Sequence, residues 1–391
     1  MDKENQSFYS RFDYQLAFLL FLLFCASMVA IYAAQSTSGQ YEGGNYLIRQ
    51  IVWYIVGGII VAIVMYFDSE QLQRVTWYLY GFGLFLLGLL VILPESIVPT
   101  INGARSWFQI PGLSLQPSEF VKVFVILALS QIITTHHQKY LNKSLQTDFI
   151  LLVKMGITAV VPIMFIMKQP DLGTSLVILA ILAGMTFVSG ISWKIITFIS
   201  LSITLVGTTV LYLVIQAPEF LNEYLGIKQY QLGRIYSWLN PEVYKSGEGY
   251  HLLNSLKAIG SGQVFGKGLG TGDVYIPENH TDFIFSVIGE QFGFIGTSIV
   301  LSIFFLLVYH LVKVAMETTE SFNSYLCAGV ISMIVFHVFQ NAGMTIGLLP
   351  ITGIPLPFIS YGGSSMMGSM FAIGLIFGIR YHHRVYMFSN D

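Results

Sequence analysis

Charge is scarce in this sequence. Lys, Arg, Asp and Glu together make up 10% of the 391 residues, against about 25% in an ordinary soluble domain. Hydrophobic residues make up 54%, and the mean hydropathy is +0.67. A soluble domain of this length does not need so much apolar surface, so the composition excludes that class and indicates a membrane protein with several spans. The net charge of −2 gives no indication of a nucleic-acid partner.

The sequence is also poor in cysteine, and we expect neither a cleavable leader nor internal repeats. The two cysteines, Cys25 and Cys327, lie inside apolar runs, which indicates packing and not a disulfide. The first apolar run, residues 16–34, is too long for the core of a signal peptide, and more such runs follow. The lack of a visible repeat weighs against a transporter built from inverted repeats. We therefore expect one integral membrane domain over residues 1–391.

Apolar runs with the length of a membrane-spanning helix recur along the chain. They predict an all-α polytopic membrane protein with about ten spans. An even number of spans puts both termini on one side, and the excess of Lys and Arg in the segments of that side identifies it as the cytoplasm. The predicted spans are 16–34, 47–67, 75–93, 118–135, 149–167, 172–189, 193–215, 283–312, 324–349 and 359–379.

A long polar interval, residues 217–282, separates the seventh and eighth predicted spans. With both termini inside, this loop is extracellular, as are the loops 94–117 and 350–358. The interval ends at Asp282, directly before an apolar span. An ionisable residue at the mouth of a membrane helix is costly unless it has a function or a partner. Asp282 is therefore a candidate catalytic residue, and the alternative is an N-cap of the helix that follows.

The loop 94–117 and the start of the next span carry a group of candidate binding residues. Arg105 suits phosphate, and Trp107 suits either a substrate contact or an anchor at the membrane interface. Glu119 and Lys122 are three residues apart, so they share one helix face just inside the membrane. A substrate site and a structural ion pair that neutralises itself both explain these two charges.

The predicted turn between the fifth and sixth spans carries Lys168, Gln169 and Asp171. Asp171 fits the N-cap of the sixth span, because Pro170 and Asp171 stand where that helix begins. Capping does not explain Lys168 and Gln169, which we expect to face outward beside it. All three residues are candidates for binding a substrate on the outer side.

Residues 341–365 contain prolines and glycines that should break a helix at membrane depth. Irregular backbone is tolerated there only against protein or a water-filled cavity. The helix that opens across Ser360 to Ser365 has free N–H groups that can hold an anion such as phosphate. Ser360, Gly362 and Gly363 are therefore candidate binding residues, and a re-entrant turn with small residues for close packing is the alternative.

The same segment resembles the signature of a known family, the SEDS proteins (shape, elongation, division and sporulation), also called the RodA/FtsW/SpoVE group. Similar motifs extend over nearly the whole chain, and within the family the sequence looks closest to the RodA members. One departure is His251 and Asn254, which stand where two glutamines are expected. The signature positions are Asn341, Gly347, Pro350, Gly353, Ser360, Gly362 and Gly363, and the other motifs include Gly103-Ala-Arg-Ser-Trp107, Gln116-Pro-Ser-Glu119, Gln169-Pro-Asp-Leu-Gly-Thr174 and His280-Thr-Asp-Phe-Ile-Phe285.

The resemblance implies a ten-span peptidoglycan glycosyltransferase in the bacterial plasma membrane. Such enzymes polymerise lipid II, a disaccharide pentapeptide on undecaprenyl pyrophosphate, and work with a class B penicillin-binding protein. It also implies that Asp282 is the essential aspartate and that Arg105, Trp107, Glu119 and Lys122 belong to the site. Family members need divalent cations, so Mg or Mn is implied, but the sequence shows no cluster of metal ligands.

The chemistry of this reaction agrees with the candidate residues. A sugar hydroxyl that attacks an anomeric carbon needs a general base, for which Asp282 is the candidate. The departing pyrophosphate needs cations, for which Arg105, Lys122 and Lys168 are the candidates. Two alternatives are a flippase that moves lipid II across the bilayer and a scaffold that only holds the penicillin-binding protein. A flippase needs polar residues along a full transmembrane path, where only Lys154 and Glu290 are available.

The predicted orientation can be tested by cysteine labelling. Single cysteines at Ser246 and Gly272 should react with a membrane-impermeant thiol reagent in intact cells, whereas one at Asn142 should not. Labelling of the first two positions only after permeabilisation would reverse the orientation and remove the case for extracellular chemistry.

Overall fold

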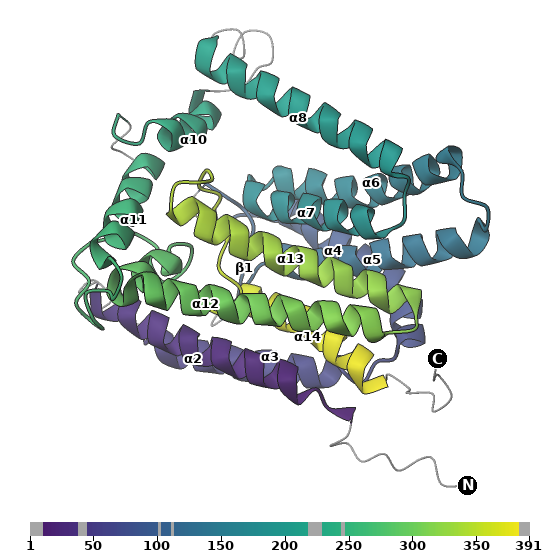
Figure 1. The fold of residues 1–391 in the computed structure, drawn as a ribbon, viewed down its shortest axis with the longest axis horizontal. Helices are drawn as coiled ribbons and strands as arrows, with labels where there is room; N and C mark the ends of the chain where they lie inside the picture. The colour runs from purple at the N-terminus through teal and green to yellow at the C-terminus, as the bar shows by residue number, and fades with distance from the viewer. Residues whose placement is uncertain are drawn as a thin grey trace.

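The computed structural model describes residues 11–37, 45–100, 103–110, 113–217, 229–243 and 247–382 (Figure 1). Within these residues the regular secondary structure is helical apart from one short hairpin. The helices are α2 (Tyr14–Thr37), α3 (Tyr46–Val64), α4 (Ser69–Ile92), α5 (Pro117–Lys139), α6 (Leu145–Met167), α7 (Leu172–Val188), α8 (Trp193–Gln216), α10 (Gln229–Leu239), α11 (Glu248–Gly262), α12 (Ile284–Glu317), α13 (Ser321–Thr345) and α14 (Gly363–His382), and the hairpin strands are β1 (Phe108–Ile110) and β2 (Leu113–Leu115).

The fold class predicted from composition and apolar runs is confirmed. Each predicted span has a helix at its position, namely α2 to α8 and α12 to α14. Among the described residues, nine of these helices are long and apolar enough to cross a membrane, and α7 is a shorter apolar helix. The last helix begins at Gly363 and not at residue 359, because the residues before it are held in an irregular conformation.

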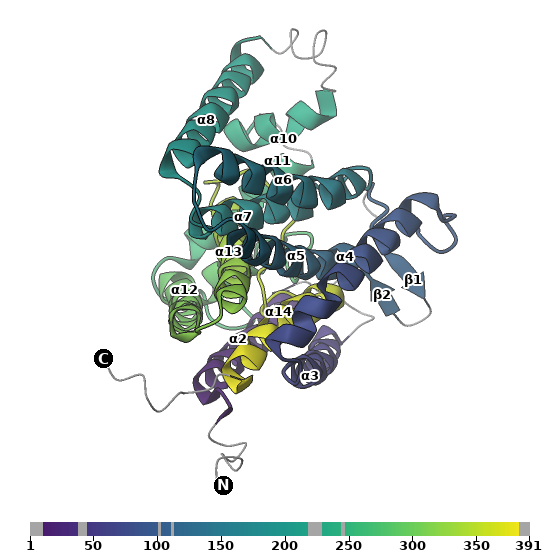
Figure 2. The ribbon, with the colours of Figure 1, turned by 90° about the vertical axis from the view of Figure 1, so that its right-hand side faces the viewer.

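Helix α5 forms the centre of the bundle, in contact with α4, α6, α7, α13 and α14. Most of its side chains are therefore buried, although its first two turns carry the charged residues Glu119 and Lys122. Helix α8 is the opposite case, since only Ile196 and Val214 are buried in it. Both ribbon views show α8 standing apart from the bundle (Figures 1 and 2). Helix α10 packs against its far end, where the Tyr236 hydroxyl donates a hydrogen bond to the carbonyl of Val214 at 2.8 Å.

Helix α12 is broken near its start by Gly293, whose backbone angles are not helical (φ 63°, ψ −158°). The residues that follow α11 pack directly against this break. A Cβ at Gly293 would lie 2.4 Å from the backbone nitrogen of Gly266 and 2.6 Å from the carbonyl oxygen of Val264. The amide of Phe294 donates to the carbonyl of Gln263 at 2.9 Å, which satisfies a backbone group that the break leaves free. The glycine therefore lets the long loop dock beside the break in α12.

The predicted helix break in residues 341–365 is also confirmed. Helix α13 ends at Thr345, and no helix or strand is present until α14 begins at Gly363. Gly347 and Gly353 have φ angles of 75° and 70°, in the left-handed region that glycine adopts without steric cost. This irregular segment lies in the interior, where Leu356, Phe358 and Ile359 are buried.

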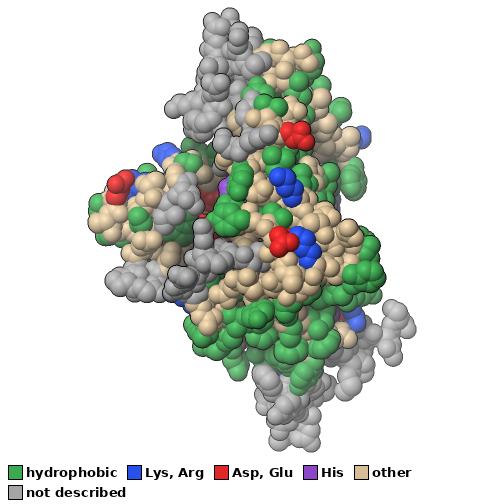
Figure 3. All heavy atoms as spheres, turned by 90° about the vertical axis from the view of Figure 1, so that its left-hand side faces the viewer, with side chains coloured by type: hydrophobic (Ala, Val, Ile, Leu, Met, Phe, Trp, Pro, Cys, Tyr) green, Lys and Arg blue, Asp and Glu red, His purple; other side chains and the backbone are tan. Residues whose placement is uncertain are grey.

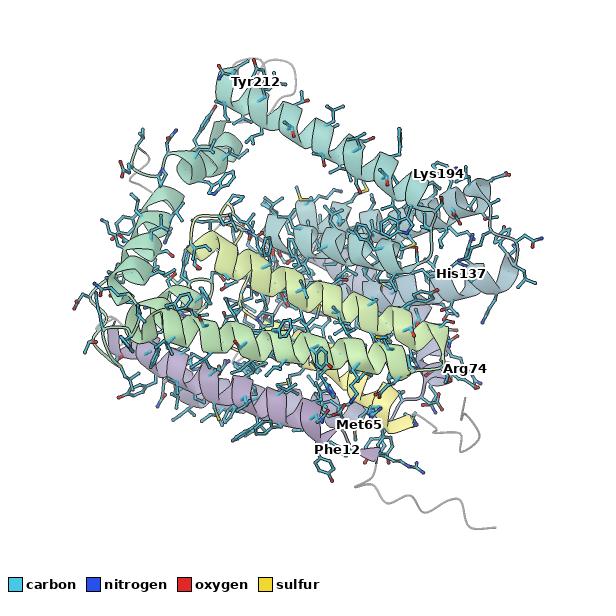
Figure 4. All side chains as sticks on the ribbon, in the orientation of Figure 1. Phe12, Met65, Arg74, His137, Lys194 and Tyr212 are labelled. Carbon is cyan, nitrogen blue, oxygen red and sulfur yellow. The ribbon has the colours of Figure 1, made fainter. Side chains whose placement is uncertain are left out.

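The residues just before α2 contact α14 and α12 at one end of the bundle. The rings of Phe12 and Phe377 stack with their centroids 5.5 Å apart, and His310 Nε2 lies 2.7 Å from Asp13 Oδ2. Figure 4 places Phe12 at the same end as Arg74 and Lys194, two of the residues that the sequence assigns to the cytoplasmic side. The arrangement agrees with an even number of spans, and the side of the membrane stays a prediction.

Candidate active site

A cavity of about 1360 Å³ lies at the opposite end of the bundle from the start of α2. It is lined by the first turns of α3, α5, α7 and α14, by residues of the β1–β2 hairpin and the loop before it, by the segment 278–282 before α12, and by residues 352–355. Figure 3 looks at the left-hand end of Figure 1 and shows a recess left of centre, where acidic and histidine side chains lie below the surrounding atoms. His337 on α13 lines the cavity as well. Polar groups from eight parts of the chain therefore meet in one place.

Asp282 lines this cavity, and the family signature fixes its position through the backbone. The carbonyls of three consecutive residues each accept a hydrogen bond from the signature segment. Asn341 Nδ2 donates to Asp282 at 2.8 Å, and Ser360 Oγ donates to Thr281 at 2.6 Å. The amide of Tyr361 donates to the carbonyl of His280 at 2.9 Å. The side chain of Asp282 is left to face the cavity, where its Oδ2 would lie 3.4 Å from a Cβ built on Gly353.

The alternative interpretation of Asp282 as a helix cap is wrong. Helix α12 begins at Ile284 with Phe283 at the N-cap position, and no side chain caps it. The carboxylate of Asp282 has no recorded hydrogen bond to any described residue. Burial, together with the negative charges of Glu278 and Asp171, raises the pKa of Asp282 to about 7. A carboxylate with a pKa near 7 and no partner is suited to take up a proton at neutral pH.

Glu119 and Lys122 form the predicted pair on one face of α5. Lys122 Nζ lies 2.8 Å from Glu119 Oε2, and both side chains are almost completely buried. Both also line the cavity. A third residue completes the group, since His337 Nε2 on α13 lies 3.1 Å from Lys122 Nζ. The pair is thus structural and faces the site, so the two interpretations offered by the sequence do not exclude each other.

Asp171 is the N-cap of α7, as its position before the helix predicts. Its Oδ1 accepts from the amide of Thr174 at 2.9 Å, and its Oδ2 accepts from the Thr174 hydroxyl at 2.7 Å and from Gln116 Nε2 at 3.0 Å. The residue also lines the cavity. These bonds tie the start of α7 to the start of α5, so Asp171 helps to build the wall of the site.

Trp107, Gly362 and Gly363 line the cavity as well. Gly363 is the first residue of α14, so the free N–H groups of that helix open into the site as predicted. The ring of Trp53 lies so close that a Cβ on Gly363 would be 2.6 Å from its Cε2. Only glycine fits at this point between α3 and α14.

Four predicted site residues are not part of the cavity. The Arg105 guanidinium donates to the carbonyl of Leu93 at 2.6 Å, so it fastens its loop to the end of α4. Lys168 is exposed at the end of α6. The expectation that Gln169 faces outward is wrong, because only 1% of its surface is exposed and its Nε2 donates to the carbonyl of Leu87 at 3.4 Å. Ser360 is buried and uses its hydroxyl to hold Thr281.

Among the lining residues that carry a charge or an imidazole, three are absent from the predicted site, namely Arg49, Glu278 and His337. Arg49 and His337 lie inside the predicted spans 47–67 and 324–349, and an ionisable residue inside a span is by itself a sign of function. His337 also precedes Asn341 by four residues, so the two share a helix face. Glu278 is a non-glycine residue with a φ of 55°, a conformation that the sequence does not reveal.

The long loop contacts Glu290 on α12 and Phe283, the residue just before that helix. Glu290 is buried and accepts from Lys267 Nζ at 2.8 Å and from the amide of Asp273 at 2.9 Å. Its charge is therefore paired within the loop. The two residues that depart from the family pattern also have structural partners, since the ring of His251 stacks on Phe283 with centroids 5.8 Å apart and Asn254 Nδ2 donates to the carbonyl of Tyr275 at 3.0 Å.

The fold and the cavity define a polytopic helical membrane protein with a polar site at one end of its bundle. The sequence matches the FtsW/RodA/SpoVE family of cell cycle proteins over residues 14–385. The chain therefore belongs to that family.

Curated relatives from several bacteria cover almost the full chain. The sequence is 33% identical to the probable peptidoglycan glycosyltransferase FtsW of Trichlorobacter lovleyi, over 94% of this chain and 93% of that protein. It is 33% identical to the stage V sporulation protein E of Bacillus subtilis, over 95% and 98% of the two chains. It is 30% identical to the peptidoglycan glycosyltransferase RodA of Treponema pallidum, over 95% and 98%. These identities do not single out the RodA branch.

Solved structures show the same architecture. A chain from a peptidoglycan synthase complex that coordinates polymerization and crosslinking superposes with a TM-score of 0.75 and 26% identity, over 94% of this chain and 97% of that one. The rod shape determining protein RodA of Thermus thermophilus superposes with a TM-score of 0.66 and 26% identity, over 94% and 96%.

Proposed function

We propose that this protein is a peptidoglycan glycosyltransferase that polymerises lipid II into β-1,4-linked glycan strands for cell-wall elongation and cell shape. The observation that carries the proposal is the carboxylate of Asp282, which faces a polar cavity without a hydrogen-bond partner among the described residues and has a pKa of about 7. Relatives named as peptidoglycan glycosyltransferases support the reaction class.

The reaction needs one base and a site for a departing diphosphate. The 4-hydroxyl of the acceptor sugar attacks the anomeric carbon of the donor sugar, and its oxygen forms the new β-1,4 bond. The bond from that carbon to the diphosphate oxygen breaks, and the polyprenyl diphosphate leaves with the electron pair. Asp282 takes the proton of the attacking hydroxyl. Because the base must be ionised to do so, a pKa near neutrality keeps it both available and sufficiently basic.

The departing diphosphate gathers negative charge, so cations and N–H donors near it lower the barrier. Of the three cations proposed from sequence, only Lys122 lines the cavity, and Glu119 balances its charge. Arg49 also lines the cavity from the first turn of α3, is exposed, and forms no ion pair with a described residue. We therefore assign the diphosphate to Arg49, with Lys122 and the N-terminus of α14 as further donors.

The flippase alternative is weaker than the enzyme. It relies on charges along a transmembrane path, and the two available residues do not form one. Glu290 is paired with Lys267 in the loop, whereas Lys154 is exposed and lies 5.9 Å from the ring of Tyr140 on the outside of the bundle. The ionisable residues of the cavity are gathered at one end. A pure scaffold would have no need for a buried charge group beside an unpartnered carboxylate.

The proposed function also predicts a partner protein and a cellular location. A class B penicillin-binding protein supplies crosslinking, in line with the synthase complex that this chain resembles. The protein lies in the bacterial plasma membrane with both termini in the cytoplasm, which puts the cavity on the outer face. The expected divalent cation, Mg or Mn, stays a prediction without assigned ligands. Among the described residues no group of three or more His, Cys, Asp or Glu could hold a metal ion.

The role of Asp282 is tested by Asp282→Asn. Asparagine keeps the size of the side chain and removes the base, and no helix cap is lost because Asp282 does not cap α12. We expect polymer formation from lipid II by the purified protein to fall by roughly a hundredfold or more, with unchanged expression and melting temperature. Asp273→Asn, which alters an exposed carboxylate of the same loop, should polymerise normally. An Asp282→Asn protein with near wild-type activity would refute the assignment.

Substitution of Arg49 and of Arg105 should distinguish a residue that binds substrate from one that stabilises the fold. Arg49→Gln removes a charged contact worth about 1.5–3 kcal/mol, so KM for lipid II should rise about 10- to 100-fold with little change in melting temperature. Arg105→Gln removes the bond to the Leu93 carbonyl, so the melting temperature should fall. Arg74→Gln, at the far end of the bundle, is the control (Figure 4). The assignment fails if Arg49→Gln leaves KM unchanged while Arg105→Gln raises it without loss of stability.

A further inference from the structure

The ammonium group of Lys122 is held between two acceptors from different helices. Glu119 Oε2 lies 2.8 Å from Nζ on the same helix α5, and His337 Nε2 on α13 lies 3.1 Å away. All three residues line the cavity. All three side chains are also more than nine-tenths buried, so their contacts are with protein and the cavity and not with the lipid.

A second hydrogen bond decides which nitrogen of His337 carries the proton. Its Nδ1 lies 2.7 Å from the carbonyl oxygen of Met333, one turn earlier on α13. A carbonyl can only accept, so Nδ1 carries the hydrogen and donates it. Nε2 is then left with a lone pair directed at Lys122, whose ammonium group can only donate. The imidazole therefore acts as a neutral acceptor, and its orientation is set by the helix it belongs to.

This arrangement leaves one donor of Lys122 for a ligand. An ammonium group has three N–H bonds, of which one is directed to Glu119 and one to His337. No other acceptor for Nζ is recorded among the described residues, and Lys122 lines the cavity. With two N–H bonds fixed, the direction of the third follows from the tetrahedral geometry of the nitrogen. With Glu119 alone, the group could rotate about that single contact.

We propose that His337 is a positioning residue, which accepts a hydrogen bond from Lys122 and so aims the remaining N–H of Lys122 at the diphosphate or sugar oxygen that gains charge during transfer. This inference rests on the proposed function. Placement of a donor before the reaction matters because a donor that is already oriented needs no reorganisation when charge develops. The neutral imidazole orients the ammonium group and leaves the positive charge of Lys122 in place. A second carboxylate would cancel that charge.

The test compares His337→Phe with His337→Gln in polymerisation of lipid II by the purified protein. Phenylalanine keeps the ring but has no acceptor, so kcat should fall about tenfold or more, with a smaller change in KM. Glutamine offers an amide oxygen and should restore most of kcat. His310→Phe is the matched control, since it replaces another buried histidine, at the far end of the bundle. It should lower the melting temperature and leave the kcat of the folded protein unchanged.

A double-mutant comparison distinguishes positioning from an independent effect. In a Lys122→Met background, His337→Phe should change kcat by less than twofold, because there is no ammonium left to orient. The proposal is overturned if His337→Phe lowers kcat by the same factor in the Lys122→Met background as in the wild type. It is also overturned if the His337→Phe protein has the kcat of the wild type. Either result would leave the proposed function intact, because the wild-type protein would still polymerise lipid II. A wild-type protein that makes no polymer would contradict the proposed function itself.

Discussion

The site depends on the hydrogen bonds between the irregular signature segment and the three residues that end at Asp282. Asn341, Ser360 and Tyr361 satisfy three consecutive backbone carbonyls. Such groups must find partners because an unpaired backbone carbonyl in a buried position is costly. The helix break between α13 and α14 supplies two of these donors, the Ser360 hydroxyl and the amide of Tyr361, and an intact helix would have used that amide internally. The third donor is the side chain of Asn341 on α13. The side chain of Asp282 does not cap α12, although a residue just before a helix often does.

Most of the charged side chains around the cavity have an ion-pair or hydrogen-bond partner. Lys122 is balanced by Glu119, and Asp171 is engaged in capping α7. Glu290, which does not line the cavity, is paired with Lys267. The groups without a recorded ion pair or hydrogen bond among the described residues are Arg49 at the mouth and the carboxylate of Asp282. Unpartnered charges are expensive at the edge of a membrane, so these two are the strongest candidates for contact with an anionic sugar substrate.

Much of the fold could be predicted from the sequence, because apolar length and breaks by proline and glycine act locally. The helices at the ten predicted positions and the break after Thr345 follow from such signals. The site was predicted in part. Glu119 and Lys122 are three residues apart, and Asp171 precedes a helix, so their positions along the chain are enough to predict them. The contact between Lys122 and His337 joins α5 to α13, and the bond from Arg105 to Leu93 depends on how a loop folds back. Neither can be inferred from positions along the chain.

The most direct test of the account is the pH dependence of kcat/KM for polymerisation by the purified protein. A base must be ionised, so the raised pKa of Asp282 predicts that the rate falls as the pH drops below about 7. Glu278→Gln removes a neighbouring negative charge, which lowers that pKa and moves the fall in rate to lower pH. Glu242→Gln, at an exposed site outside the cavity, should leave the profile unchanged. A rate that stays constant from pH 5 to 8, or a profile that Glu278→Gln does not move, would contradict the account.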